Sequence, residues 1–213
     1  MRDRRPARAC ADGRGRREVA STPVTGPRRL SQAISEGDGI SILVEVLDAD
    51  AARNAEEQGA EGIVLRTSAG GVRAATALPL VWNGSLEYAA DADAVVVDVD
   101  TERERLAEVI DEVHALGVEC VLRVRDEDEL EHVLDLVDPE ILLLSAEDAD
   151  DDQHHLDRLL ELLLDVPAGK LAIAELVVAS PDEIAELERA GVDAVLVTAG
   201  DIAPLVRDAP PEV

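Results

Sequence analysis

The sequence predicts a single compact α/β domain, a closed (β/α)8 TIM barrel whose second and third crossovers are shortened. Between Ile40 and Val206, eight short aliphatic runs alternate with polar or amphipathic stretches. Runs rich in Val, Ile and Leu without strict alternation are typical of parallel strands that are covered on both faces. In such barrels, the functional residues follow the carboxyl ends of the strands. An open doubly wound sheet is the structural alternative.

The expected strands are the aliphatic runs themselves, at residues 40–47, 62–67, 78–82, 94–99, 118–124, 140–145, 170–176 and 193–198. Five intervening segments carry apolar residues at helical spacing, at residues 50–59, 101–116, 126–137, 152–164 and 181–190. The crossovers at 72–77 and 85–91 are too short for full helices, so we expect one or two turns in each.

The helix boundaries carry local signals. We expect N-caps at Asp50, Thr101 and Ser180, because their side chains can accept hydrogen bonds from the first free backbone N–H groups. The C-terminal stops are expected at glycines, which tolerate a left-handed backbone, namely Gly59, Gly117 and Gly191.

Charge divides the chain into unlike parts. The net charge is -27, but the first 30 residues carry nine Arg against three acidic residues, which leaves -33 on the remainder. We expect residues 1–38 to form an Arg-rich disordered extension, with a short helix near Leu30 to Ile34 able to cover the barrel bottom, residues 39–207 to form the barrel, and residues 208–213 a flexible tail. An Arg-rich arm can bind nucleic acid or an acidic surface, but a plain extension is the preferred interpretation, and nucleic acid is not an expected partner.

The composition favours a cytoplasmic protein. Of 20 basic residues only Lys170 is Lys, whereas Asp and Glu total 47, which favours a halophilic adaptation over ordinary acidity. The acidic runs are then solvated surface rather than cation sites. Cys10 and Cys120 do not indicate a disulfide framework, no apolar region follows the N-terminal arginines, and no run is long enough to span a membrane.

Two turns after expected strands have residues suited to phosphate. Hydroxyl groups and flexible backbone amides can bind an anion, and the candidates are Ser68, Gly70, Gly71, Thr198 and Gly200. Asp201 argues against the second turn, since a carboxylate there repels phosphate. The adjacent His154 and His155 point in different directions on a helix, so we expect no metal site, and no motif indicates a cofactor.

Several segments resemble the indole-3-glycerol phosphate synthase family. LGVECVLRVRDEDELEHVL (116–134) is similar to the family's LGMEALVEVHDEEELERAL, and AELVVASPDEIAELERAGVDAVLV (174–197) to its SESGIRTPEDVARLRAAGADAVLV. LPLVWNGS (78–85) is similar to LPVLRKDF, and LVEVL (43–47) more weakly to AEIKR. The resemblance implies a phosphate-binding TIM barrel of tryptophan biosynthesis with carbon–carbon lyase activity.

The same alignment implies a changed site. The family's general-acid Lys, substrate-binding Lys and base Glu correspond to Asn83, Leu47 and Arg123, none of which can perform these roles. Its Asn-Asn-Arg-Asp motif begins at Ser145, and its phosphate-binding Ser-Gly and Gly-Glu-Ser correspond to residues 176–177 and 198–200. Only Glu45 and Glu175 match functional carboxylates of the family.

The two carboxylates admit two interpretations. If Arg123 faces inward, Glu45 and Glu175 can pair with it, because a buried carboxylate requires a cation. Alternatively, Glu45 or Glu175 is a general acid or base, while Arg66, Asn83, Arg123, Arg125 or Ser145 binds an anionic substrate.

We therefore expect a divergent indole-3-glycerol phosphate synthase-like barrel that has lost the parent ring closure. Its activity would be that of a lyase or isomerase on a phosphorylated or anionic small molecule. The alternative is a catalytically silent paralogue that binds a metabolite or a protein.

Overall fold

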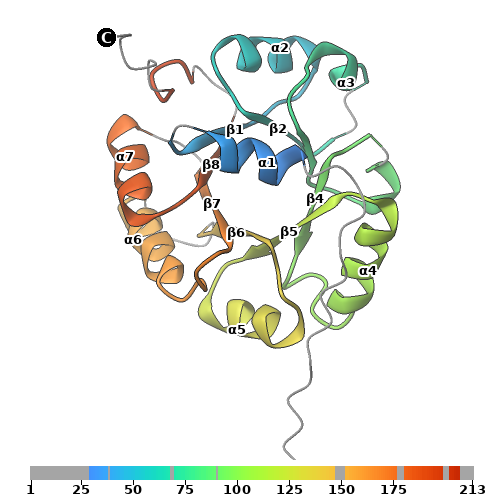
Figure 1. The fold of residues 1–213 in the computed structure, drawn as a ribbon, viewed down its shortest axis with the longest axis vertical. Helices are drawn as coiled ribbons and strands as arrows, with labels where there is room; N and C mark the ends of the chain where they lie inside the picture. The colour runs from blue at the N-terminus through green and yellow to red at the C-terminus, as the bar shows by residue number, and fades with distance from the viewer. Residues whose placement is uncertain are drawn as a thin grey trace, which may run out of the picture.

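A computed structural model describes residues 29–37, 39–67, 70–89, 91–146, 152–176, 180–198 and 202–206, without the side chains of residues 152–154. Eight parallel strands form a closed barrel in chain order, and the last strand pairs with the first (Figure 1). The predicted (β/α)8 barrel is thus confirmed, and the closing pair excludes the open sheet.

All eight strands lie within the predicted aliphatic runs. Neither face of these strands meets water, since the outer face is covered by helices and the inner face fills the barrel. The strands are β1 Ser41–Glu45, β2 Gly62–Leu65, β3 Leu80–Trp82, β4 Ala94–Asp98, β5 Glu119–Val124, β6 Ile141–Ser145, β7 Leu171–Leu176 and β8 Ala194–Thr198.

Helices surround the barrel where helical spacing predicts them. The five full helices are α2 Ala49–Glu57, α4 Leu106–Leu116, α5 Glu127–Leu136, α6 Asp152–Leu163 and α7 Pro181–Ala190. The second and third crossovers contain only the one-turn helix α3 Val72–Ala75 and the 3-10 turn η1 Leu86–Tyr88, as the short segments predict.

Two of the three expected N-caps are wrong. Asp48, not Asp50, caps α2 by accepting hydrogen bonds from two backbone N–H groups. Helix α4 begins at Leu106 rather than after Thr101, because residues 101–105 form turns. At α7 the prediction is confirmed, since Ser180 and Glu183 form a reciprocal capping box.

The helix expected near Leu30 to Ile34 is α1, Arg29–Glu36, which lies across the amino-terminal end of the barrel (Figure 1). Leu30 and Ile34 are buried within the cluster that fills the barrel interior. The buried Glu119 at the start of β5 accepts hydrogen bonds from the backbone N–H groups of Leu30 (2.8 Å) and Ser31 (3.2 Å). A carboxylate from the barrel therefore holds the N-terminus of α1, where the helix dipole favours negative charge.

Candidate functional site

A ring of eight polar residues forms the carboxyl-terminal mouth of the barrel. Each follows an aliphatic residue of the interior cluster by two positions, so each lies on the inward face of its strand, one layer above the apolar interior. Their order around the barrel is Glu45, Arg66, Asn83, Asp98, Arg123, Ser145, Glu175 and Thr198.

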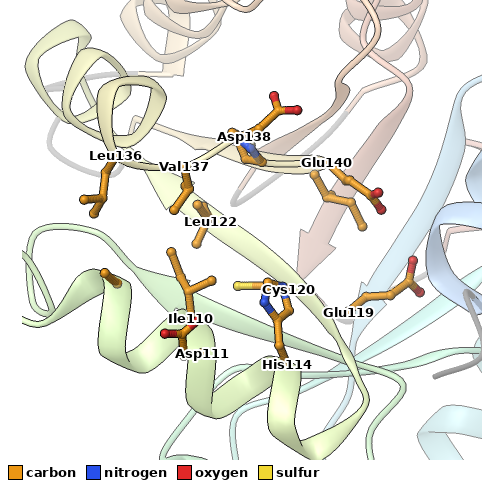
Figure 2. Close-up of a pocket in the computed structure, with 13 residues that line it drawn as sticks. Ile110, Asp111, His114, Glu119, Cys120, Leu122, Leu136, Val137, Asp138 and Glu140 are labelled. Carbon is orange, nitrogen blue, oxygen red and sulfur yellow. The ribbon is translucent and has the colours of Figure 1, made fainter. Parts of the chain in front are cut away.

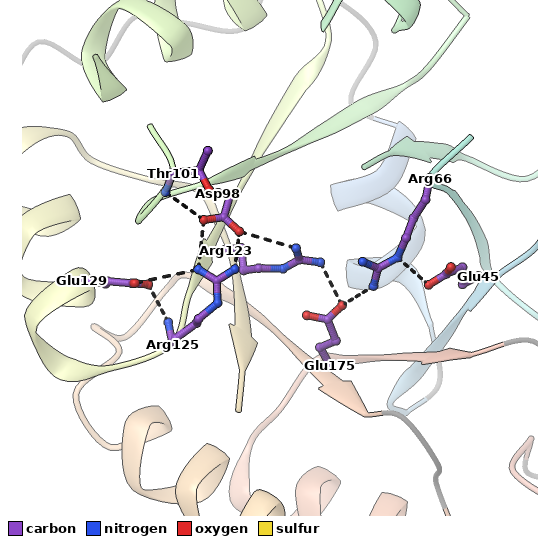
Figure 3. A network of polar contacts seen from close by, with 8 residues as sticks. All are labelled: Glu45, Arg66, Asp98, Thr101, Arg123, Arg125, Glu129 and Glu175. Atoms are coloured by element: carbon purple, nitrogen blue, oxygen red, sulfur yellow. Dashed lines mark hydrogen bonds and ion pairs between the residues drawn. The ribbon is translucent and has the colours of Figure 1, made fainter. Parts of the chain in front are cut away.

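Glu175 is the centre of the ion pairs across this mouth (Figure 3). Its Oε1 accepts hydrogen bonds from Arg123 Nη2 at 2.9 Å and from Arg66 Nη2 at 3.0 Å. The side chains of Arg123 and Glu175 are only 6% and 7% exposed, whereas Arg66 is 40% exposed. Two guanidinium groups thus donate charge-assisted hydrogen bonds to one carboxylate oxygen in a site that excludes most water.

Asp98 extends the ion pairs to the other side of the barrel. It contacts Arg123 at 3.7 Å and binds Arg125 through both carboxylate oxygens. Burial alone would raise the pKa of Asp98, but hydrogen bonds from Arg125 and the backbone of Thr101, with the charges of Arg125 and Arg123, lower this pKa to about 2.

Glu129 on α5 is the last member of the chain of contacts. It accepts a hydrogen bond from the backbone N–H of Arg125 at 2.8 Å. Burial raises the pKa of Glu129, although the contact with Arg125 opposes that shift. Acids and bases thus alternate through what we call the mouth network, formed by Glu45, Arg66, Glu175, Arg123, Asp98, Arg125 and Glu129.

The predicted pairing of Arg123 is correct for one carboxylate and wrong for the other. Arg123 contacts Glu175, as expected from its inward position. Glu45, however, contacts Arg66 at 2.8 Å, and the second carboxylate at Arg123 is Asp98. The reason is position around the barrel, because β1 adjoins β2 whereas β4 adjoins β5.

Four mouth atoms are buried without a hydrogen-bond partner among the described residues: Arg123 Nε, Ser145 Oγ, Glu175 Oε2 and Asn83 Nδ2. Three of them belong to the consecutive strands β5, β6 and β7, and Ser145 and Glu175 are register partners. Buried polar atoms are ordinarily satisfied by protein, water or ligand. Within the described residues, these atoms therefore leave unused hydrogen-bonding capacity at the mouth.

The expected phosphate-binding residues are only partly within the described chain. Gly70 and Gly71 form an exposed turn, in which Gly71 has a φ of 87° and precedes α3. Thr198 is exposed at the end of β8, in register with Glu45. Ser68 and Gly200 lie outside the described residues. The structure thus places Thr198 at the mouth and the Gly70–Gly71 turn beside β2.

Other site classes have no support in the described segments. Within these segments, no group of three or more His, Cys, Asp or Glu side chains is placed to hold a metal ion. None of the helices there is long and apolar enough to cross a membrane.

The sequence resembles indole-3-glycerol phosphate synthases. It is 29% identical to that of Shouchella clausii (strain KSM-K16) over 107 residues, or 50% of this chain and 42% of the relative. It is 27% identical to those of Geobacillus sp. (strain WCH70) and Halalkalibacterium halodurans, over the same lengths. The aligned segment thus spans less than half of each relative. No protein-family profile matches the chain.

A solved structure shows the same fold. The N-acetylmannosamine-6-phosphate 2-epimerase from Clostridium perfringens matches with a TM-score of 0.60 and 14% identity. The match covers 77% of this chain and 88% of the epimerase. At this identity the likeness supports the barrel architecture alone.

Proposed function

We propose that this barrel binds a phosphorylated or carboxylated small molecule at its mouth and does not catalyse the ring closure of indole-3-glycerol phosphate synthases. The observation that carries the proposal is the set of buried atoms on Arg123, Ser145 and Glu175 that have no hydrogen-bond partner within the described part of the chain. Arg123 Nε is a donor, Glu175 Oε2 is an acceptor, and Ser145 Oγ is either. A ligand that satisfies them has an anionic oxygen beside a hydroxyl or amino group.

Loss of ring closure follows from the residues in the mouth. The resemblance assigns general-acid and base roles to the positions of Asn83 and Arg123, and Arg123 is held in a buried ion pair. Neither side chain exchanges a proton at neutral pH. General acids and bases each contribute roughly 10² to 10⁴ in rate, so their joint loss removes most of the catalysis.

Glu175 is the residue we assign to any remaining proton transfer. Its Oε1 is fixed by two arginines, while Oε2 has no partner among the described residues. A bound ligand hydroxyl at Oε2 can give up a proton there, which supports a lyase or isomerase on an anionic substrate. The second candidate, a silent paralogue, is supported by the same contacts, because ion pairs of this kind can have a purely structural role.

Ligand-dependent thermal stabilisation tests the proposed binding. Ribose 5-phosphate and anthranilate are titrated at constant ionic strength, with sodium chloride as the salt control. A ligand at 100 times its dissociation constant adds about 2.7 kcal/mol of stability. Ser145→Ala should weaken binding about fivefold through loss of one hydrogen bond worth about 1 kcal/mol.

Ser35→Ala is the matched control, because Ser35 is exposed on α1 at the opposite end of the barrel. Equal affinity in wild type and Ser145→Ala would contradict the assigned site. Turnover of 1-(2-carboxyphenylamino)-1-deoxyribulose 5-phosphate, or complementation of a tryptophan auxotroph, would contradict the loss of ring closure.

A further inference from the structure

A cavity lies outside the barrel, away from the mouth network. It has a volume of about 310 Å³ and opens between α4 and α5 at the amino-terminal end of β5 (Figure 2). Apolar side chains from α4, β5 and the end of α5 form its walls, namely Ile110, Leu122, Leu136 and Val137. Every residue that lines it belongs to the described segment 91–146. We call it the α4–α5 pocket.

A short side chain on the outer face of β5 leaves room for this pocket. Successive residues of a strand alternate between its two faces, so Cys120 and Leu122 point outward, whereas Val121 belongs to the cluster that fills the barrel. Leu122 is buried under the helices, but the shorter Cys120 is only partly buried and faces the pocket (Figure 2). The recess is therefore part of the wall of the barrel and not of a surface loop.

The α4–α5 pocket contains a buried polar atom without a partner. His114, in the last turn of α4, lines the pocket, and its buried Nδ1 makes no hydrogen bond to any described residue. Buried polar atoms are ordinarily satisfied by protein, water or ligand. An imidazole nitrogen donates or accepts according to whether it carries the proton. A hydroxyl group can do both, so it suits His114 in either form.

The size and charge of the lining define the rest of a ligand. An apolar cavity of roughly 150 Å³ holds one benzene molecule, so the α4–α5 pocket has room for two fused rings. Among the described residues that line it none is Arg or Lys, and Asp111 lies one turn before His114 on the same helix. A carboxylate or phosphate would lose its water here without gaining a cation. The lining therefore disfavours anions, unlike the mouth with its arginines.

We propose that the α4–α5 pocket binds an uncharged molecule of one or two rings that carries a hydroxyl group. The rings pack against Ile110, Leu122 and Leu136, and the hydroxyl forms a hydrogen bond with His114 Nδ1. This ligand differs in chemical class from the anionic molecule proposed for the mouth, and its site shares no residue with the mouth network.

The probe is 2-naphthol, which is uncharged at neutral pH and has two fused rings and one hydroxyl. Its binding to the full-length chain is measured by equilibrium dialysis, with the protein in excess over the ligand. Naphthalene, which lacks the hydroxyl, should bind about fivefold more weakly, through loss of one hydrogen bond. Naphthalene-2-sulfonate, which has an anion in place of the hydroxyl, should bind more weakly by about tenfold or more.

Two substitutions connect this binding to the pocket. Cys120→Ile fills the recess with a larger apolar side chain and should lower the affinity for 2-naphthol by about tenfold or more. His114→Phe keeps a ring but removes Nδ1, so it should lower the affinity for 2-naphthol about fivefold and leave that for naphthalene nearly unchanged.

His132→Phe is the matched control. His132 also has a buried nitrogen without a partner among the described residues, but it does not line the pocket. Both affinities should therefore stay unchanged in this variant. Circular dichroism melts establish that each variant is folded, and His114→Phe decides the matter if Cys120→Ile does not fold.

Three outcomes would overturn the proposal. The first is the absence of saturable 2-naphthol binding, and the second is equal affinity for 2-naphthol in wild type and Cys120→Ile. The third is equal affinity for naphthalene and 2-naphthol, or an equal loss of both in His114→Phe, which would exclude the hydrogen bond. A measurement without ligand is also available, because filling an apolar cavity stabilises a protein. Cys120→Ile should raise the melting temperature, and a lowered value would show that the recess has no room for a ring.

Discussion

Removal of Arg123 tests whether the mouth network stabilises the barrel. Arg123→Leu places an apolar side chain at this position and deletes the guanidinium that contacts Glu175 at 2.9 Å and Asp98 at 3.7 Å. Breaking a buried pair by removing one partner costs about 3 to 5 kcal/mol. We expect the lower end, about 3 kcal/mol, because Arg66 remains 3.0 Å from Glu175 and Arg125 remains bound to Asp98.

The loss should be recovered by removing the charge that Arg123 leaves uncompensated. Adding Glu175→Gln to Arg123→Leu should restore about 1 to 2 kcal/mol, since residues in one ion-pair network are not additive. Glu45→Gln is the matched control, because Glu45 contacts Arg66 rather than Arg123, and it should restore nothing.

The assay is urea unfolding followed by circular dichroism, with the free energy of unfolding extrapolated to water. If the free energy of unfolding of Arg123→Leu lies within about 0.5 kcal/mol of the wild-type value, as for ordinary surface substitutions, the stabilising role of the network is refuted. Equal recovery by Glu45→Gln and Glu175→Gln would show that general charge reduction, not the specific contact, is responsible.

Three further predictions address other parts of the chain. Because the folded pKa of Asp98 is depressed to about 2, its contribution to stability is present above about pH 4 and is lost as pH falls toward 2. Asp98→Asn should therefore lower the free energy of unfolding by about 1 kcal/mol at pH 6, after allowance for solvent screening, and by much less at pH 2.5. The control Asp157→Asn, at an exposed position, should show no such difference between the two pH values. If the net charge of -27 is a halophilic adaptation, the melting temperature should rise from dilute buffer to 1 M KCl, where the screening length falls to about 3 Å, and a constant melting temperature would contradict this. Ser180→Ala removes the capping box of α7 and should cost about 1 kcal/mol in urea unfolding, while loss below about 0.3 kcal/mol would argue that the cap is unimportant.

The strands could be predicted from sequence because burial on both faces leaves a local record. Each aliphatic run contains its strand. The start of a helix is harder to predict where two candidate caps lie close together, as with Asp48, which caps α2, and Asp50, which lies in its first turn. The choice depends on where β1 ends, which the sequence does not fix to one residue.

The sequence predicts most of the residues that lie at the mouth but not which of them contact each other. Seven of its eight inward positions follow from strand ends, and Asp98 was missed although it stands two residues after the buried Val96, where period-two alternation predicts an inward side chain. The partner of Glu45 could not be predicted, because contacts between side chains at the ends of different strands depend on closure and stagger. Arg66 and Glu175 are 109 residues apart in sequence and meet only when the barrel closes.

The hydrogen bonds from α1 to Glu119 can form only late in synthesis of the protein. The acceptor for the backbone N–H of Leu30 is the carboxylate of Glu119, which lies 89 residues further along the chain. At about 5 to 20 residues per second, a ribosome adds those residues in about 4 to 18 s. Throughout that interval the amino-terminal helix has neither its cap nor the barrel interior that receives Leu30 and Ile34. A nascent chain stalled before β5 should therefore leave this helix open to protease, and one extended past the barrel's last strand should protect it.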